Sequence, residues 1–184
     1  YGTSFKIMLK DNTELEITAK VLGAHNVSNL ALAAAVAYEM GLSPDEIKRG
    51  ARRIESAPHR LQLLHRGNDI IIDDAYNANP TSMAAALENF TLMQHDHKVA
   101  IIGEMRELGD ASAEEHAKVV EHLGKVGCQQ IWLVGENFLP FAEQYKVFRN
   151  VDEVKAELQQ TPITNSLILV KGSNGTKLFT LPEL

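Results

Sequence analysis

The sequence predicts an α/β protein: a Rossmann-like, mainly parallel sheet with an antiparallel edge strand, preceded by a small piece made of a hairpin and helices. Beyond residue 58, short apolar runs alternate with segments of helical spacing, which is typical of βαβ units around a parallel sheet. The tight-turn pair Gly67-Asn68 joins the first two of these runs and indicates the antiparallel strand.

The front of the chain, residues 1–56, is expected to form a hairpin and two helices. The hairpin surrounds the turn-forming pair Asp11-Asn12, Gly41 stops the first helix, and Ser43 with Glu46 forms a capping box for the second. The predicted strands are 5–9 and 14–18, and the predicted helices are 26–40 and 43–54. This piece is too small to bury a full core. We therefore predict a boundary near residues 56–58 and, because the chain opens with Tyr1, a piece of a larger protein.

The remainder, residues 57–184, carries the alternating pattern. The predicted strands are 61–66, 69–73, 98–102, 130–134, 146–148 and 167–170. Asn79 and Pro80 begin one helix, Ser112 with Glu115 forms a capping box for a helix at 112–126, and Asn150 caps a third. A short helix is expected at 139–144. Parallel strands with right-handed crossovers follow from this order.

Composition excludes several classes of protein. A net charge of -6 without a basic block argues against nucleic-acid binding, which needs clustered lysines and arginines. The single cysteine, Cys128, indicates a reducing compartment. No apolar run reaches the roughly 18 residues that span a bilayer. We expect a cytoplasmic monomer without membrane insertion, and we interpret His95-Asp96-His97 as a polar loop rather than a metal site.

The strand that ends at Asp73-Asp74 leads directly into a polar cluster. Tyr76, Asn77 and Asn79 follow the two carboxylates before Pro80 begins a helix. In an open α/β sheet, ligands bind at the carboxyl ends of strands. Consecutive strand residues point to opposite faces, so one carboxylate can accept from a ligand hydroxyl or serve a metal while backbone donors hold the other. The alternative is an acidic pair that only shapes a turn.

Two further groups suit nucleotide chemistry. Asn26 and Asn29 are three residues apart at a helix start, and their amides match the hydrogen-bonding edge of adenine. Taken alone, Asn26 is better explained as a helix cap than as a ligand contact. Arg60 lies at the predicted boundary and can bind a phosphate or ribose with its planar guanidinium, or form a surface salt bridge.

Two loops after later strands are candidates for substrate contact. Glu104 and Arg106 lie in Gly-Glu-Met-Arg-Glu-Leu-Gly (103–109), which lacks dinucleotide-fingerprint spacing and can equally be a solvated loop. Lys171 begins Lys-Gly-Ser-Asn-Gly-Thr-Lys (171–177) and can neutralise an anion at this edge. Because the chain has no phosphate-loop sequence, it has no evident means of holding a triphosphate alone.

The order and spacing of these motifs resemble the Mur ligase family of peptidoglycan synthesis. The resemblance covers nearly the whole chain. It is carried by Gly23, His-Asn-Val-Ser-Asn (25–29), Pro-His-Arg-Leu-Gln (58–62), Asp-Asp-Ala-Tyr-Asn-Ala-Asn-Pro (73–80), residues 103–109 and Val-Lys-Gly-Ser (170–173). The Tyr-Asn-Ala-Asn-Pro version resembles the members that add D-alanyl-D-alanine to UDP-N-acetylmuramoyl-tripeptide.

The resemblance implies an ATP-dependent, amide-forming ligase of three domains that uses ATP and Mg²⁺ to make an acyl phosphate, which the dipeptide amine then attacks. Residues 1–56 would end the central ATP-binding domain, and residues 57–184 would form the C-terminal domain. Nucleotide contacts are implied for Asn26, Asn29, Arg60 and Asp74. Substrate contacts are implied for Tyr76, Asn77, Asn79, Glu104, Arg106 and Lys171.

The chain departs from the family pattern in lacking the phosphate loop, the magnesium-binding acid and the modified lysine of the central domain. It is therefore expected to be inactive alone, with no firmly assigned catalytic residue and no metal ligand. Two alternatives remain. Asp73-Asp74 with Lys171 superficially fit a doubly wound phospho-receiver, although Ile101-Ile102-Gly103 offers no aspartate at the central strand end. A stand-alone nucleotide-binding module is the other.

Overall fold

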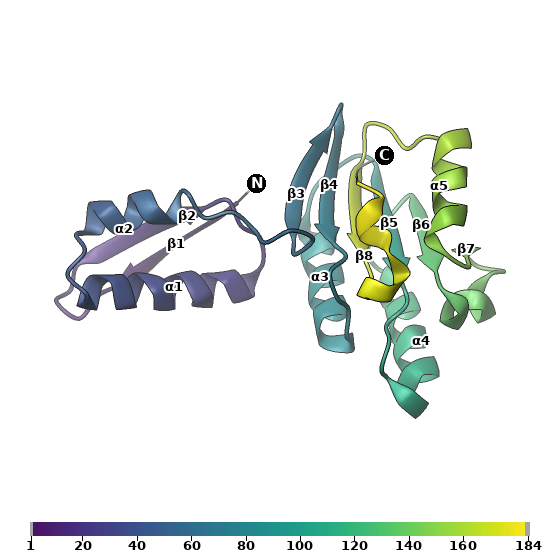
Figure 1. Cartoon of the computed structure of the whole chain (residues 1–184), viewed down its shortest axis with the longest axis horizontal. Coiled ribbons are helices and arrows are strands. Elements are labelled where there is room, and N and C mark those ends of the chain that lie inside the picture. The colour runs from purple at the N-terminus through teal and green to yellow at the C-terminus, as the bar shows by residue number, and fades with distance from the viewer. Residues whose placement is uncertain (1, 183–184) are drawn as a thin grey trace. The chain divides into compact units, whose positions relative to one another are not determined.

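The computed structural model describes residues 2–182, with only the backbone for His25. Within this range the chain forms two compact units, which divide between Ala57 and Pro58 and are described separately (Figure 1). No helix among the described residues is long and apolar enough to cross a membrane.

The first unit is an antiparallel hairpin packed against two helices. Strands β1 (Thr3–Met8) and β2 (Glu14–Ala19) pair with Phe5 opposite Ile17, and helices α1 (Ala24–Glu39) and α2 (Pro44–Ala51) follow. Alternation places Leu15, Ile17 and Ala19 on the buried face of β2. These side chains meet Leu30 and Ala34 of α1 and Ile47 of α2 in a small core. The predicted hairpin and helices are confirmed.

Two boundaries in the first unit differ from the sequence prediction. Helix α1 begins at Ala24, two residues early, because Gly23 occupies the cap position with a φ of 96° that favours glycine. Asn26 therefore lies in the first turn, where its Nδ2 donates to the Leu22 carbonyl at 2.7 Å, and it is not the N-cap. Helix α2 ends at Ala51 rather than Ile54. Its capping box, from Ser43 to Glu46, is present.

The second unit contains a six-stranded sheet in the order β3-β4-β8-β5-β6-β7. Its strands are β3 (Gln62–Arg66), β4 (Asp69–Asp74), β5 (Lys98–Gly103), β6 (Gln130–Val134), β7 (Lys146–Phe148) and β8 (Leu167–Lys171). Only β3 is antiparallel to its neighbour, and the remaining pairs are parallel. The predicted mainly parallel sheet with an antiparallel edge strand is therefore confirmed.

Helices cover both faces of this sheet (Figure 1). On one face α3 (Pro80–Leu92) and α4 (Ser112–Leu123) bury Leu87, Phe90 and Leu123 against alternate strand residues such as Ile102. On the other face α5 (Val151–Gln160) buries Val154 against the intervening residues. Short 3-10 turns complete the unit: Gly109–Ala111, Glu136–Phe141, Asn174–Thr176 and Leu178–Thr180. A sheet buried on both faces explains the near-continuous apolar strands.

Of the four helices predicted in this unit, two have the predicted caps and two need correction. Asn79 and Asn150 cap α3 and α5 as predicted. The predicted Ser112 capping box is wrong: Ser112 is already helical, and its hydroxyl lies 3.1 Å from Asn137 Oδ1. Helix α4 also ends at Leu123 instead of Val126. The predicted helix at 139–144 is a 3-10 turn at Glu136–Phe141 that contains Pro140.

Candidate functional site

The carboxyl ends of β4, β8 and β5 meet at one edge of the sheet. Asp74 is in register with Lys171, and Lys171 is in register with Ile102. The segments that leave these strands therefore start side by side, although nearly a hundred residues separate the first from the last. The sequence predictions for residues 73–79, 103–106 and 171 thus fall on one edge, which is the ligand-binding edge of this class of sheet.

Asp74 and Lys171 form an ion pair across two adjacent strands. Lys171 Nζ lies 2.5 Å from Asp74 Oδ2 and 3.4 Å from the Asn77 carbonyl, and the lysine is 1% exposed. The Leu61 backbone N–H donates to Asp74 Oδ1 at 3.1 Å. Lys171 is therefore charge-paired rather than free to meet an anion. Asp74 retains acceptor capacity, since each carboxylate oxygen carries two lone pairs and its side chain is 16% exposed.

Arg60 lies over the face of the Tyr76 ring, with its Cζ 4.2 Å from the ring centroid. Both side chains are exposed, and no carboxylate pairs with Arg60 among the described residues. The predicted alternative of a surface salt bridge is therefore not observed. Attraction between the guanidinium charge and the ring face holds Arg60 there without using its N–H groups in a carboxylate pair. Arg60 is thus presented as a ready donor for an anionic ligand.

Asp73 is directed into the protein and binds His59. Its Oδ2 lies 2.6 Å from His59 Nδ1, and its Oδ1 accepts from the Ala75 backbone N–H at 3.3 Å. Burial raises the pKa of the Asp73 carboxyl, and the hydrogen bond from His59 opposes that rise. The other side of the His59 ring packs near Phe179, with ring centroids 5.3 Å apart. Sequence reasoning assigned His59 no role, since the two partners are far apart in the chain.

The amides after β4 have local backbone partners. Asn79 Oδ1 accepts from the Ser82 backbone N–H at 2.8 Å and so caps α3. Asn77 Oδ1 accepts from the Ala78 backbone N–H at 2.9 Å. Both residues are exposed. Their oxygens are committed to the turn, so the side-chain NH₂ groups are what they offer to a ligand.

A second group lies after β5. Glu104 Oε2 accepts from Asn137 Nδ2 at 2.8 Å, and Glu104 Oε1 lies 3.8 Å from Arg106 Nε. The Arg106 backbone N–H donates to Ser173 Oγ at 3.0 Å, and its guanidinium donates to the Gly175 carbonyl at 3.4 Å. Glu104 and Arg106 thus join the ends of β5, β6 and β8. Sequence reasoning missed Asn137 and Ser173 as their partners.

In the first unit, Asn26 and Asn29 both lie on α1, within its first two turns. Asn26 is half-buried and its Nδ2 is bonded to the Leu22 carbonyl. Asn29 is exposed. The expected helical spacing of the two amides is therefore present, although Asn26 Nδ2 already has a protein partner.

No group of three or more histidine, cysteine, aspartate or glutamate side chains that could hold a metal ion occurs within residues 2–182. The nearest acidic pair at the sheet edge, Asp73 and Asp74, is directed to His59 and Lys171.

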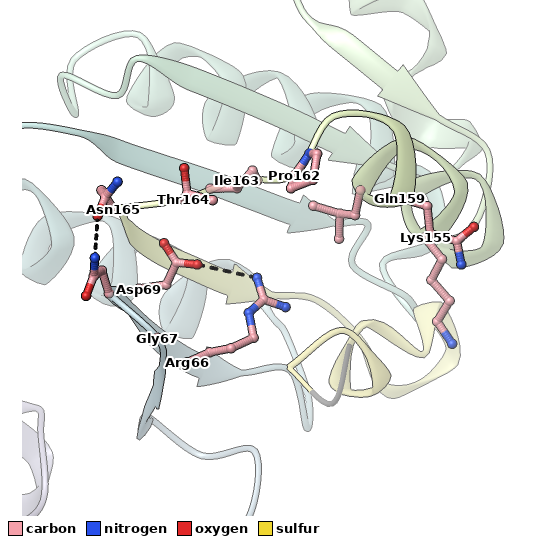
Figure 2. Close-up of a pocket in the computed structure, with 11 residues that line it drawn as sticks. Arg66, Gly67, Asp69, Lys155, Gln159, Pro162, Ile163, Thr164 and Asn165 are labelled. Carbon is pink, nitrogen blue, oxygen red and sulfur yellow. Dashed lines mark hydrogen bonds and ion pairs between the residues drawn. The ribbon is translucent and has the colours of Figure 1, made fainter.

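An open cavity of about 670 Å³ lies at the opposite, amino-terminal edge of the sheet (Figure 2). It is lined by the β3–β4 turn and by the segment from α5 to β8, including Arg66, Asp69, Lys155 and Asn165. Arg66 pairs with Asp69 at 3.6 Å, and Asn68 donates to Asn165 at 2.9 Å. None of the predicted site residues lines it. The candidate site is therefore the polar strand edge rather than this cavity.

The chain is similar to a family model described as Mur ligase, glutamate ligase domain, which matches residues 59–174. UDP-N-acetylmuramoyl-tripeptide--D-alanyl-D-alanine ligase from Rickettsia prowazekii is 32% identical over 91% of this chain and 39% of its own length. The enzyme of the same name from Bacillus subtilis is 30% identical over 96% of this chain and 40% of its own length. The chain thus spans about two fifths of these relatives.

Solved structures are similar over the same extent. MurF from Acinetobacter baumannii superposes with a TM-score of 0.82 and 29% identity, over 100% of this chain and 43% of that one. MurF ligase from Thermotoga maritima, solved in complex with ADP, has a TM-score of 0.76 and 20% identity over 99% of this chain and 42% of that one.

Proposed function

The chain belongs to the Mur ligase family, and from this premise we propose that it is the C-terminal part of an ATP-dependent ligase that adds D-alanyl-D-alanine to UDP-N-acetylmuramoyl-tripeptide. The observation that carries the proposal is that relatives bearing this name align with 91% and 96% of the chain. A cytoplasmic location accompanies it, in agreement with ATP as a substrate and a single cysteine.

We assign the two parts of the chain to different domains of that ligase. Residues 57–184 are its C-terminal domain, in agreement with the family-model match at 59–174. Residues 1–56 are the end of its central ATP-binding domain. The central domain would supply the phosphate loop, whose sequence this chain lacks, and most of the Mg²⁺ ligands.

ATP is the nucleotide that these residues suit best. Asn29 and Asn26 on α1 offer amide groups for a base edge. Arg60, stacked on Tyr76, offers a planar donor for a phosphate or for ribose oxygens. Asp74, which is partly exposed, offers a carboxylate that accepts from ribose hydroxyls.

Tyr76, Asn77, Glu104 and Arg106 are assigned to the side of the incoming dipeptide, where they present an aromatic ring, an amide and two charges. Asn79 and Lys171 lie at the same edge of the sheet but act indirectly. Asn79 caps α3, and Lys171 pairs with Asp74. In the proposed reaction the peptide carboxylate attacks the γ-phosphorus of ATP and releases ADP. The amine of D-alanyl-D-alanine then attacks the acyl carbon, expels phosphate and loses a proton.

The test uses the longer protein that carries this chain, with UDP-N-acetylmuramoyl-tripeptide, ATP and D-alanyl-D-alanine. We expect ADP release that depends on the dipeptide, and a new amide product in the mass spectrum. Arg60→Ala should raise the KM for ATP by about tenfold or more, since a charge-assisted hydrogen bond contributes roughly 1.5–3 kcal/mol. A well-folded protein that releases no ADP with these substrates contradicts the proposal.

Arg149→Ala is the matched control. Arg149 is also exposed and follows β7, so it lies at the same carboxyl edge but at the far end of the sheet from β4. It should leave the KM for ATP unchanged. If both substitutions raise the KM equally, a general loss of positive charge explains the effect, and Arg60 loses its assignment.

A further inference from the structure

Arg60 is flanked by two residues whose backbone is in the left-handed region. His59 has a φ of 58° and Leu61 a φ of 48°, and neither is a glycine. Such conformations cost about 1–3 kcal/mol each in non-glycine residues and persist only where surrounding contacts hold them. Leucine is an unfavourable residue for this region, since it cannot stabilise it with a local side-chain hydrogen bond. The turn at 59–61 is therefore imposed by its surroundings.

Three contacts of the turn come from the end of β4 and the residues just after it, while the His59 backbone N–H also donates to Gln62 Oε1 at 3.3 Å and the His59 ring packs near Phe179. The Tyr76 backbone N–H donates to the His59 carbonyl at 3.0 Å. The Leu61 backbone N–H donates to Asp74 Oδ1 at 3.1 Å. Between them, the His59 ring is held by Asp73 Oδ2 at 2.6 Å. Each of the two strained residues thus has its own bond to this strand end.

The position of Asp73 is unusual for a strand buried on both faces. It is 0% exposed, and its neighbours Ile71, Ile72 and Ala75 are apolar and buried. A carboxylate there loses hydration that an apolar residue would not need, so the fold alone does not favour it. Its partners are the turn residue His59 and the Ala75 backbone N–H. The Asp73 carboxylate therefore binds the turn through its contact with His59.

We infer that His59 and Asp73 are positioning residues, which clamp the turn at 59–61 and thereby place the Arg60 guanidinium on the Tyr76 ring, preorganised for its ligand. That the positioned Arg60 guanidinium binds a nucleotide rests on the proposed function. The positioning of Arg60 by His59 and Asp73 does not depend on that function. Without the clamp the turn relaxes to ordinary backbone angles, and Arg60 leaves the ring.

The clamp is tested on the 184-residue chain without nucleotide, by measuring the NMR shifts of the Arg60 side-chain protons. In the wild-type chain the Tyr76 ring current should shift these protons upfield. His59→Ala should abolish the upfield shift. His59→Asn should retain it, because an asparagine amide can donate from nearly the place of Nδ1, and asparagine tolerates the left-handed region.

The matched control is Asp69→Asn. Asp69 is also a buried carboxylate on β4, but it lies at the other end of the strand and accepts from the Ser166 backbone N–H at 3.0 Å. It can reduce stability, yet it should leave the Arg60 shifts in place. Asp73→Ala removes the acceptor for the His59 ring and provides a second disruption of the clamp should His59→Ala fail to fold. A folded His59→Ala or Asp73→Ala chain with unchanged Arg60 shifts overturns the inference.

The consequence for binding is tested separately in the longer protein. His59→Ala should raise the KM for ATP at least several-fold with a smaller change in kcat, and His59→Asn should restore it. Combining His59→Ala with Arg60→Ala should be no worse than Arg60→Ala alone, because both act through one guanidinium. If Arg60→Ala has no effect on the KM, the nucleotide assignment of the proposed function fails, whereas the clamp is still judged by the NMR result. Additive effects of the two substitutions contradict the positioning role.

Discussion

At the scale of single residues, the few buried acidic and lysine side chains each bind an oppositely charged group or a backbone group. Among the described residues, the buried acids and lysines are Asp69, Asp73, Lys98 and Lys171. Lys98 Nζ donates to the carbonyls of Phe90 and Val126, at 2.7 and 3.2 Å, and so satisfies its charge with backbone groups. An unpartnered buried charge would destabilise the folded state by several kcal/mol, so the fold depends on these partners.

The partners of these residues were not predictable from their positions in the sequence. The polar run at 73–79 correctly indicated a polar strand end, and alternation predicted that Asp73 and Asp74 would point to opposite faces. Which one faces His59 and which one faces Lys171 depends on the neighbouring strand and on the turn before β3. Lys171 is 97 residues from Asp74. Local pattern carries no information about a pairing at that separation.

Cys128 gives a prediction for pH dependence. Burial raises the pKa of its thiol from 9.0 to about 11, and nearby Lys98 opposes the rise only in part. At pH 8 its thiolate fraction is then on the order of a hundredfold below that of a free thiol, so alkylation by iodoacetamide should be slower by at least that factor. The rate should rise steeply toward pH 11. A rate equal to that of an unfolded control peptide contradicts the raised pKa.

The same shift affects stability with a definite sign. The folded state holds the Cys128 proton more tightly than the unfolded state, so the contribution is fully present below about pH 9 and is lost as pH rises toward 11. Urea unfolding of the wild type and Cys128→Ala across this range isolates it, since other titrating groups are common to both. The stability of the wild type relative to the variant should fall with pH.

At the scale of elements, caps and close approaches decide where helices and strands end. Asparagine before a first helical turn was a reliable signal at α3 and α5, whereas the serine-glutamate pattern at α4 was misleading, since Ser112 lies inside the helix. Gly103, the last residue of β5, lies beside Gly172, which follows β8. A Cβ on Gly172 would come within 3.0 Å of Gly103 Cα, so the two strand ends approach this closely because Gly172 has no side chain.

Asn79→Ala should lower the free energy of unfolding by about 1 kcal/mol, because it removes the acceptor for the Ser82 N–H at the start of α3. Asn79→Ser should recover most of that loss. Urea denaturation followed by circular dichroism measures both. An unchanged midpoint for Asn79→Ala contradicts the cap.

Asn150→Ala is the matched control for the cap. Asn150 Oδ1 accepts from Asp152 N and Glu153 N at the start of α5, so its loss should destabilise the chain to a similar degree. The two variants differ in the longer protein. If Asn79 also contacts the dipeptide, Asn79→Ala should raise the KM for D-alanyl-D-alanine and Asn150→Ala should not.

At the scale of the whole molecule, the two compact units differ in how complete their cores are. The second unit has a sheet covered on both faces, with two clusters of buried side chains. The first has one small cluster, and it exposes Leu32 and Val36, four residues apart on α1, and Met40 just beyond the end of that helix. The first unit therefore leaves a substantial part of its apolar surface in water.

We expect residues 58–184 to fold alone, because the sheet and its covering helices lie within this range. Residues 1–57 should show little cooperative unfolding alone, since a unit of this size with an incomplete core is marginal. Overlay of the ¹H–¹⁵N spectra of the separate pieces on that of the whole chain measures both. Collapsed amide dispersion for residues 58–184 contradicts the expectation.

The sequence by itself determined the class of fold, the order of strands and helices along the chain, the edge hairpin at Gly67-Asn68 and the caps at Asn79 and Asn150. These features depend on periodicity, turn chemistry and capping, which act over a few residues. It also determined that polar groups follow three strands.

Only the tertiary structure decided what those polar groups do. The spatial order of the strands brings Lys171 to Asp74 and Ser173 to Arg106, and the left-handed turn at 59–61 brings His59 to Asp73. Strand order and the path of a strained turn are selected by packing and by hydrogen bonds between distant segments. The physical reason is the distance along the chain over which each interaction acts. Interactions between residues close in sequence determine the helices and strands, whereas contacts between distant segments across the sheet determine the site.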